Sequence, residues 1–124
     1  MWLQRFARQG VAFPALTPGL LQLPVGTDYV SALYPDWADL KHNRALLDAA
    51  IDAWLAEMAP PFLLAPMRYT NTLGVAREHP AWQALSHFFN HQTHHRGQVA
   101  TLLTQAGVDV GVTDLIALVS AGNA

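Results

Sequence analysis

The sequence has 124 residues, of which 52% are hydrophobic and 13% charged, and its formal net charge is −2. This length suits one domain with a real core and is too short for two, so we expect a single domain over residues 1–124. The lack of a basic surplus argues against nucleic-acid binding, and the lack of cysteine excludes disulfides and thiol catalysis by the protein.

Hydropathy indicates a cytoplasmic protein that does not enter a membrane. No apolar run is long enough to cross a bilayer, and the first residues, Met-Trp-Leu-Gln-Arg, are not typical of a signal peptide. The mean hydropathy of +0.16 is high for a small domain. It indicates an apolar surface that a partner covers.

The first predicted element is a short helix over residues 2–9 that ends at Gly10. A long connection over residues 11–35 follows, with prolines at 14, 18, 24 and 35. It is too apolar for a disordered linker, so we expect it to pack. The apolar residues that favour packing are Leu16, Leu20, Leu21, Leu23 and Val25.

A long amphipathic helix is predicted from Asp36 to about Met58. Asp36 can cap the helix, and Asp39 places a second carboxylate near the positive end of the helix dipole. His42 lies roughly opposite the apolar stripe and is interpreted as a surface residue. The Pro-Pro pair at 60–61 is expected to end the helix. The stripe consists of Leu40, Leu47, Ile51, Trp54 and Met58.

Residues 62–80 show no helical period. Residues 67–75 combine β-favouring side chains with a turn-like Asn-Thr-Leu-Gly, which is typical of a small hairpin or an extended loop. His79 stands at the end of this segment, immediately before the next helix. We interpret it as a surface or capping residue and not as a metal ligand.

The second long helix is predicted over residues 80–106. Pro80 occupies a permitted first-turn position, and Gly107 ends the helix. After a connector, Thr113 is expected to cap a last short helix over residues 114–119.

This second long helix carries the sequence His-Phe-Phe-Asn-His-Gln-Thr-His-His-Arg-Gly-Gln at positions 87–98, with four of the six histidines. At 100° per residue, His95 lies in the middle of the apolar stripe and His91 lies within about 40° of it. His94 points about 100° away. The stripe also contains Phe88, Val99, Leu102 and Ala106.

His91 and His95 therefore form an inward-facing pair one turn apart. Imidazoles at this spacing, about 5–6 Å apart at Cβ, can reach one divalent metal ion. The alternative is a pair of core histidines satisfied by hydrogen bonds, but two histidines stacked on one inward face favour a metal site.

Neighbouring residues of the motif have candidate roles around this pair. Gln98 can accept a hydrogen bond from a histidine Nδ1–H and fix the tautomer. Arg96 either pairs with a carboxylate of another helix or binds a substrate anion. His87 is either a proton-transfer group at the rim of the metal cavity or a packing histidine. Gly97 costs about 1 kcal/mol relative to alanine, which predicts close approach of another helix or chain.

The motif also carries a family resemblance. His91-Gln92-Thr93-His94-His95-Arg96-Gly97-Gln98, followed by Val99 and Leu-Leu-Thr-Gln-Ala-Gly at 102–107, resembles the signature of the DinB/YfiT-like superfamily, named for DNA-damage-inducible DinB. The resemblance extends from Trp2 to about Val119. It implies an all-α helical bundle, here with about two long helices, two short ones and long ordered connections.

The resemblance further implies a divalent metal (zinc, nickel, manganese or iron) bound by a histidine triad, two of whose members match His91 and His95. The implied function is a metal-dependent enzyme that acts on a small molecule as a thiol transferase, an isomerase or a hydrolase. The alternatives are a non-catalytic metal-binding or oligomerisation module with a degenerate site, and a structural helical oligomer without metal.

The sequence departs from the family pattern at the third ligand. In the family a histidine precedes a W-L-x-x-F-like segment on the second helix, whereas Trp2-Leu3-Gln4-Arg5-Phe6 begins this chain and no histidine precedes His42. We therefore expect that the first helix and half of the second are missing. The third ligand is then an Asp or Glu, or a side chain of a second subunit, or the site is degenerate. The uncovered groove predicts a homodimer or higher oligomer.

Overall fold

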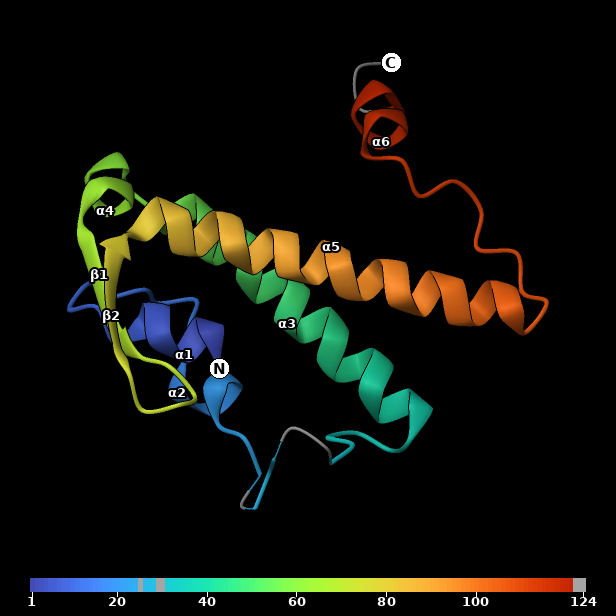
Figure 1. Cartoon of the computed structure of the whole chain (residues 1–124), viewed down its shortest axis with the longest axis horizontal. Coiled ribbons are helices and arrows are strands. Elements are labelled where there is room, and N and C mark those ends of the chain that lie inside the picture. The colour runs from blue at the N-terminus through green and yellow to red at the C-terminus, as the bar shows by residue number, and fades with distance from the viewer. Residues whose placement is uncertain (25, 29–30, 122–124) are drawn as a thin grey trace. The chain divides into compact units, whose positions relative to one another are not determined.

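The computed structural model describes residues 1–24, 26–28 and 31–121 (Figure 1). The chain divides into two compact units, Met1–Ala84 and Leu85–Ala124. One long helix, α5, begins in the first unit and continues into the second. The expectation of a single domain stays a prediction, and each unit is described by itself.

The N-terminal helix α1 spans Trp2–Ala7, close to its predicted bounds. Gly10 follows it with a φ of +78°, a backbone conformation that residues with a Cβ rarely adopt. The connection beyond contains a second short helix, α2 (Pro18–Leu21), which was not predicted. The Thr17 side chain accepts a hydrogen bond from the Leu20 amide and so supplies the N-terminal cap.

Part of this connection packs as predicted. Phe13 and Leu16 are buried, and the two leucines of α2 are half-buried. Leu23 keeps 38% of its surface exposed, so it contributes little to the core. Val25 lies outside the described residues.

Helix α3 (Trp37–Glu57) confirms the first long helix. The Asp36 carboxylate accepts hydrogen bonds from the amides of Ala38 and Asp39 at 2.8 and 3.1 Å, as expected for an N-terminal cap. Only the C-terminal half of the predicted stripe is well buried. Ile51 and Trp54 are buried, whereas Leu40 is 41% exposed.

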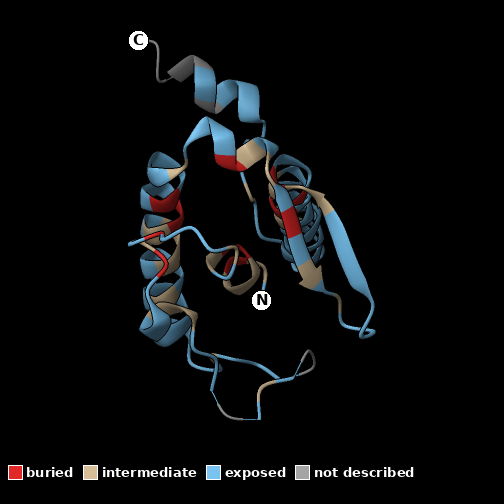
Figure 2. Cartoon of the chain, turned by 90° about the vertical axis from the view of Figure 1, so that its left-hand side faces the viewer, coloured by how far each residue is buried: buried red, intermediate tan, exposed pale blue. Residues whose placement is uncertain are grey.

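Aromatic contacts form the centre of the first unit, where Figure 2 marks buried positions on α1, α3 and the first strand. Phe6 and Trp54 are fully buried, with their ring centroids 4.9 Å apart. Phe13 packs edge-on against both Trp54, at 6.0 Å, and Phe62, at 5.0 Å. These contacts join α1, the connection, α3 and the Phe62-bearing segment that follows α3. Large aromatic rings are effective in this role because each buries much apolar surface.

The Pro-Pro pair begins a helix, which corrects the sequence interpretation. Both prolines lie in the first turn of α4 (Pro60–Leu64). The first amides of a helix have no acceptor within it, so proline loses no hydrogen bond there. The preceding helix α3 has already ended at Glu57.

Two antiparallel strands, β1 (Pro66–Thr70) and β2 (Ala76–Pro80), form the hairpin that was one of the two predicted alternatives. In its turn, the Asn71 side-chain oxygen accepts hydrogen bonds from the amides of Leu73 and Val75. The fold is therefore mainly helical but not all-α, which corrects that prediction. The helical bundle stays a prediction.

The second unit contains most of α5 (Ala81–Gln105) and the short helix α6 (Leu115–Ala121). At the end of α5, Gly107 has a φ of +79° and its amide donates to the Thr104 carbonyl, while the Val108 amide donates to the Leu103 carbonyl. This paired closure is the usual glycine-dependent end of a helix and confirms the predicted stop. In the described part of the chain, no helix is long and apolar enough to cross a membrane.

Candidate metal centre

Helix α5 places His91 and His95 one turn apart, as the spacing predicted. Their ring centroids lie 4.5 Å apart, with the ring planes inclined at 69°. The helix runs without a proline from Ala81 to Gln105, so the turn between the two histidines is regular. The two imidazole rings are therefore close neighbours on the surface of the helix.

Gln98 makes the contact predicted for it. The His95 Nδ1–H donates to the Gln98 side-chain oxygen at 2.7 Å. This hydrogen bond places the proton on Nδ1 and leaves the Nε2 lone pair available. A histidine that binds a metal through Nε2 commonly has such a partner on its other nitrogen. The donor chemistry of the pair is of the kind that divalent metals bind, because imidazole nitrogens are common metal ligands.

Two further histidines lie beside the pair. The His87 ring is 5.5 Å from that of His91, and its role at the rim of a metal cavity stays a prediction. The His94 ring is 5.2 Å from that of His95 and 6.5 Å from that of His91. Even so, the described residues contain no group of three His, Cys, Asp or Glu side chains that could hold one metal ion. The described geometry supplies a pair and not a triad.

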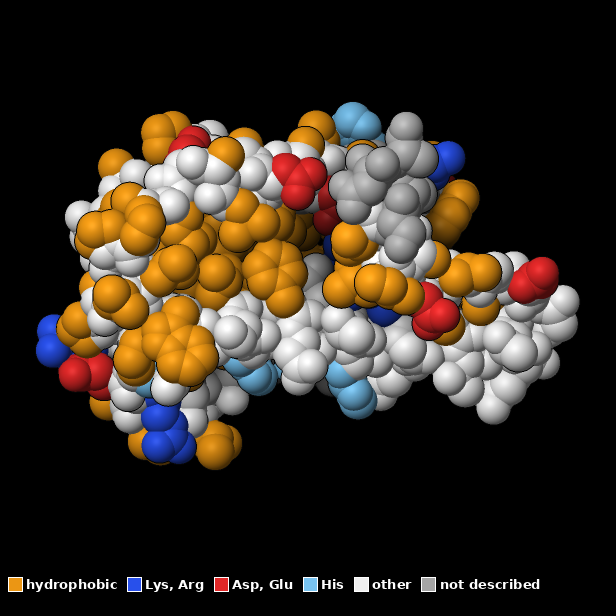
Figure 3. Space-filling view, turned by 90° about the horizontal axis from the view of Figure 1, so that it is seen from above, with side chains coloured by type: hydrophobic (Ala, Val, Ile, Leu, Met, Phe, Trp, Pro, Cys, Tyr) orange, Lys and Arg blue, Asp and Glu red, His pale blue; other side chains and the backbone are white. Residues whose placement is uncertain are grey.

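The surroundings of the pair differ from the sequence prediction. Both His91 and His95 are exposed, not buried on an inward face, and Figure 3 shows histidine side chains at the molecular surface. The reason is that the apolar stripe they share is itself uncovered beyond Phe88. Val99 is 55% and Leu102 64% exposed. An apolar stripe on a helix predicts which face is to be covered, but it does not supply the covering element.

The pKa of His91 is lowered from its ordinary value. Loss of water around the ring is the largest cause, followed by repulsion from the positive charges of His95, His87 and His94 when they are protonated. The side chain remains exposed, so this loss of water is partial. The effect favours the neutral imidazole, which is the form that binds metal ions.

Arg96 and Gly97 lie on the same helix with different surroundings from those expected. The Arg96 Nη2 donates to the Thr93 hydroxyl at 2.9 Å, and Arg96 forms no ion pair with a carboxylate among the described residues. That hydroxyl in turn donates to the Phe89 carbonyl. A Cβ added to Gly97 meets no described atom within 4 Å, so the predicted close approach is not made by the described residues.

The remaining histidines are outside this cluster. His42 is exposed on α3, as predicted. His79 was expected at the entry of a helix, but it lies half-buried in β2, where its Nε2 is 3.2 Å from the Tyr69 hydroxyl. Sequence reasoning missed this contact. The signal was the hairpin itself, since alternate strand residues of β1 and β2 share one face.

The fold and this site define a mainly helical protein that carries an exposed pair of histidines one helical turn apart. The comparison with known families is more specific: the model of the DinB family matches residues 31–121. The chain therefore belongs to the DinB family. No significant match to the chain was found among curated proteins or among solved structures.

Proposed function

We propose that this DinB-family chain binds one divalent metal ion, zinc, nickel, manganese or iron, through His91 and His95. The observation that carries the proposal is the oriented pair, with rings 4.5 Å apart and the Nδ1 of His95 engaged by Gln98 at 2.7 Å. Histidines with a packing role are expected to be buried, whereas His91 and His95 are both exposed.

We further propose a metal-dependent enzyme that acts on a small molecule as a thiol transferase, an isomerase or a hydrolase. A bound divalent ion lowers the pKa of a thiol or of water and so supplies the nucleophile. The exposure of the pair leaves room for a substrate. Arg96 uses one guanidinium nitrogen on Thr93 and has further N–H groups for a substrate anion. His87, whose ring lies beside that of His91, is the proposed proton-transfer group.

Metal analysis of protein purified without a nickel column tests the site. Stoichiometric metal is expected in the unmodified chain and is lost in the His91→Ala, His95→Ala double variant. His42→Ala is the matched control, because His42 is an exposed histidine on another helix, and it retains the metal. Metal-free protein whose melting temperature is unchanged by a chelator contradicts the proposal.

A second candidate function is a non-catalytic metal-binding or oligomerisation module with an incomplete site. It is favoured by the lack, within the described residues, of a third side chain grouped with the pair, since catalytic metal sites normally have three protein ligands. The two candidates differ in a measurement of turnover. A metal-loaded chain that transfers no thiol and hydrolyses no ester or amide supports the module.

A ligand from a second subunit would complete the site in a different way. In that case metal and association are coupled, so removal of the metal with a chelator lowers the mass measured by light scattering. In the His91→Ala variant the chelator no longer changes the mass. A mass that is independent of metal in both proteins contradicts a shared ligand and leaves the pair within one chain.

A further inference from the structure

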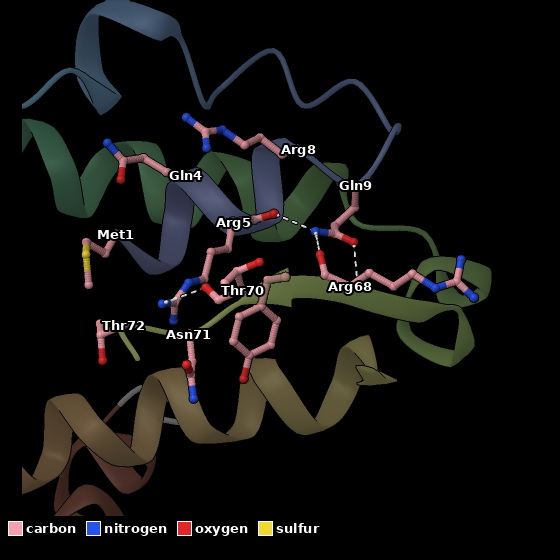
Figure 4. A pocket seen from close by; sticks show the side chains of 10 residues that line it. Met1, Gln4, Arg5, Arg8, Gln9, Arg68, Thr70, Asn71 and Thr72 are labelled. Atoms are coloured by element: carbon pink, nitrogen blue, oxygen red, sulfur yellow. Dashed lines mark hydrogen bonds between the residues drawn. The ribbon is translucent and has the colours of Figure 1, made fainter. Parts of the chain in front are cut away.

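The first unit contains an open pocket of about 450 Å³ (Figure 4). It is lined by residues of α1 and its C-terminal end and by residues 68–72 of β1 and the following turn. Its size is in the range of small-molecule sites. Three arginines, Arg5, Arg8 and Arg68, line the pocket, and none of the lining residues is acidic.

The side chain of Gln9 fixes one wall of the pocket to the other. Its Nε2 donates to the Arg68 carbonyl at 2.9 Å, and its Oε1 accepts from the Arg68 amide at 3.0 Å. The carboxamide thus pairs with the edge of β1 as the backbone of a neighbouring strand would. The same Nε2 also donates to the Arg5 carbonyl at 2.8 Å. The end of α1 is therefore attached to the hairpin by two hydrogen bonds.

Arg5 is held in a defined orientation at the pocket. The central carbon of its guanidinium lies 4.7 Å from the ring centroids of both Trp2 and Tyr69. One of its terminal nitrogens donates to the Thr70 carbonyl at 3.5 Å. Most of its five N–H donors remain for another partner. A guanidinium fixed in this way is suited to an oxyanion, whose two oxygens it can bind together.

The other two arginines differ in their availability. Arg68 forms an ion pair with Glu78, and Figure 4 shows its guanidinium pointing away from the other labelled side chains. Arg8 is exposed and has no acidic partner among the residues that the structure describes. Arg5 and Arg8 therefore leave the pocket with unneutralised positive charge, although the whole chain has a net charge of −2.

We propose that this pocket binds the oxyanion group, a carboxylate or a phosphate, of a small molecule. Arg5 and Arg8 supply the positive charge, and Thr70 and Thr72 line the same pocket. The lining residues do not include the histidine pair, and the proposal rests on none of its chemistry. The part of its lining that comes from residues 1–9 lies outside the region matched by the family model, residues 31–121.

The test is an NMR titration of the full chain, without added N-terminal residues, in which sodium phosphate and sodium acetate are added in separate experiments. Sodium chloride at matched ionic strength is the reference. We expect saturable shifts of the Arg5 and Arg8 Nε–Hε signals and of the Thr72 amide. The anion that binds more tightly identifies the group, and binding of either one supports the proposal.

Two variants decide whether the arginines are responsible. Arg8→Gln removes an exposed charge, so folding is preserved, and it is expected to weaken anion binding about tenfold, the loss typical of a charge-assisted hydrogen bond. The matched control is Arg77→Gln, an exposed arginine on β2 outside the pocket, and it leaves the affinity unchanged. The proposal is overturned if neither anion gives a saturable shift, or if both variants weaken binding equally.

Discussion

At the scale of single residues, the hydrogen bond between His95 and Gln98 determines what the histidine pair can do. A metal ligand needs one ring nitrogen with a free lone pair, and the tautomer decides which nitrogen that is. Because Gln98 accepts from Nδ1, Nε2 is the nitrogen that remains for a ligand. The ring is exposed and its described ring contacts are with other histidines, so this hydrogen bond is an important constraint on its orientation.

Replacing Gln98 therefore has a specific expected effect. Gln98→Ala removes the acceptor from His95 and weakens metal binding about 10–100-fold, as loss of such an outer partner usually does. The measurement is a competitive titration against a chromogenic chelator. Gln83→Ala, another exposed glutamine on α5, is the control and keeps the affinity. Equal affinities of the two variants would show that Gln98 does not orient the ring.

The lowered pKa of His91 has a consequence for pH dependence. Without metal, NMR titration of its ring should give a midpoint below the ordinary value of about 6.5. Since repulsion from His87 is among the causes, His87→Ala should raise that midpoint, whereas His42→Ala should not. A midpoint at or above the ordinary value in the unmodified chain contradicts the prediction.

The same shift determines the direction of the effect on stability. The folded chain holds a proton on His91 less readily than the unfolded chain does. Neutral His91 therefore stabilises the folded chain relative to protonated His91. This stabilisation is present above about pH 6.5 and is lost as the pH falls through the lower pKa of the folded state. Urea unfolding of the metal-free chain on either side of this window measures it. Metal binding should weaken in the same direction, because protons compete for the imidazoles.

At the scale of elements, helix boundaries were largely predictable from local signals. The Asp36 cap and the glycine closure at Gly107 occur where the sequence indicated. The short helices α2 and α4 were not predicted, and both begin with proline; the proline pair of α4 was interpreted as the end of the preceding helix. Proline stops a helix in its interior but is favourable in its first turn. Distinguishing these two roles requires knowing where the next element begins.

Gly97 provides a test of the surroundings of α5. Since a Cβ at this position meets no described atom within 4 Å, Gly97→Ala should stabilise the chain by about 0.5–1 kcal/mol through helix propensity alone. Urea unfolding followed by circular dichroism measures the change. A loss of stability would instead show that another helix or chain approaches the glycine closely, as its place in the motif first suggested.

At the scale of the whole molecule, the second unit contains many exposed apolar side chains. Among the described residues of this unit only Phe88 is a buried hydrophobic residue. Large apolar side chains on α5, the connector and α6 are exposed, and Figure 3 shows apolar atoms over much of the surface seen from above. The most exposed of them are Val99, Leu102, Val112, Leu115, Ile116 and Val119.

We propose that a second copy of the chain covers these residues in a homodimer or higher oligomer. Residues 85–121 carry only Arg96, Asp109 and Asp114 as formally charged side chains, so two such surfaces do not repel one another strongly. Exposed apolar area of this kind commonly marks an interface. A stable interface buries about 800 Å² per chain.

Light scattering tests this association. The unmodified chain should have the mass of a dimer or larger, and Leu102→Glu should reduce it by placing a charge in the interface. Thr101→Glu is the matched control, because Thr101 is an exposed polar neighbour on the same helix. A well-behaved monomer in the unmodified chain would count against the homodimer.

The sequence by itself determined the two long helices, the spacing of His91 and His95 and the contact of Gln98 with the pair. All of these follow from the fixed geometry of a helix, in which neighbours three and four residues apart are brought together whatever surrounds them. The hairpin was predicted less firmly, because its pairing depends on residues on both sides of a turn.

Only the tertiary structure decided that the pair is exposed and that Arg5 and Arg8 meet residues 68–72 in one pocket. Burial depends on whether a distant segment covers a helix face, and the local pattern contains no information about that segment. The contact between Gln9 and Arg68 joins positions 59 residues apart. Such a contact forms only because the aromatic core positions α1 beside the hairpin, which no periodicity of the chain records.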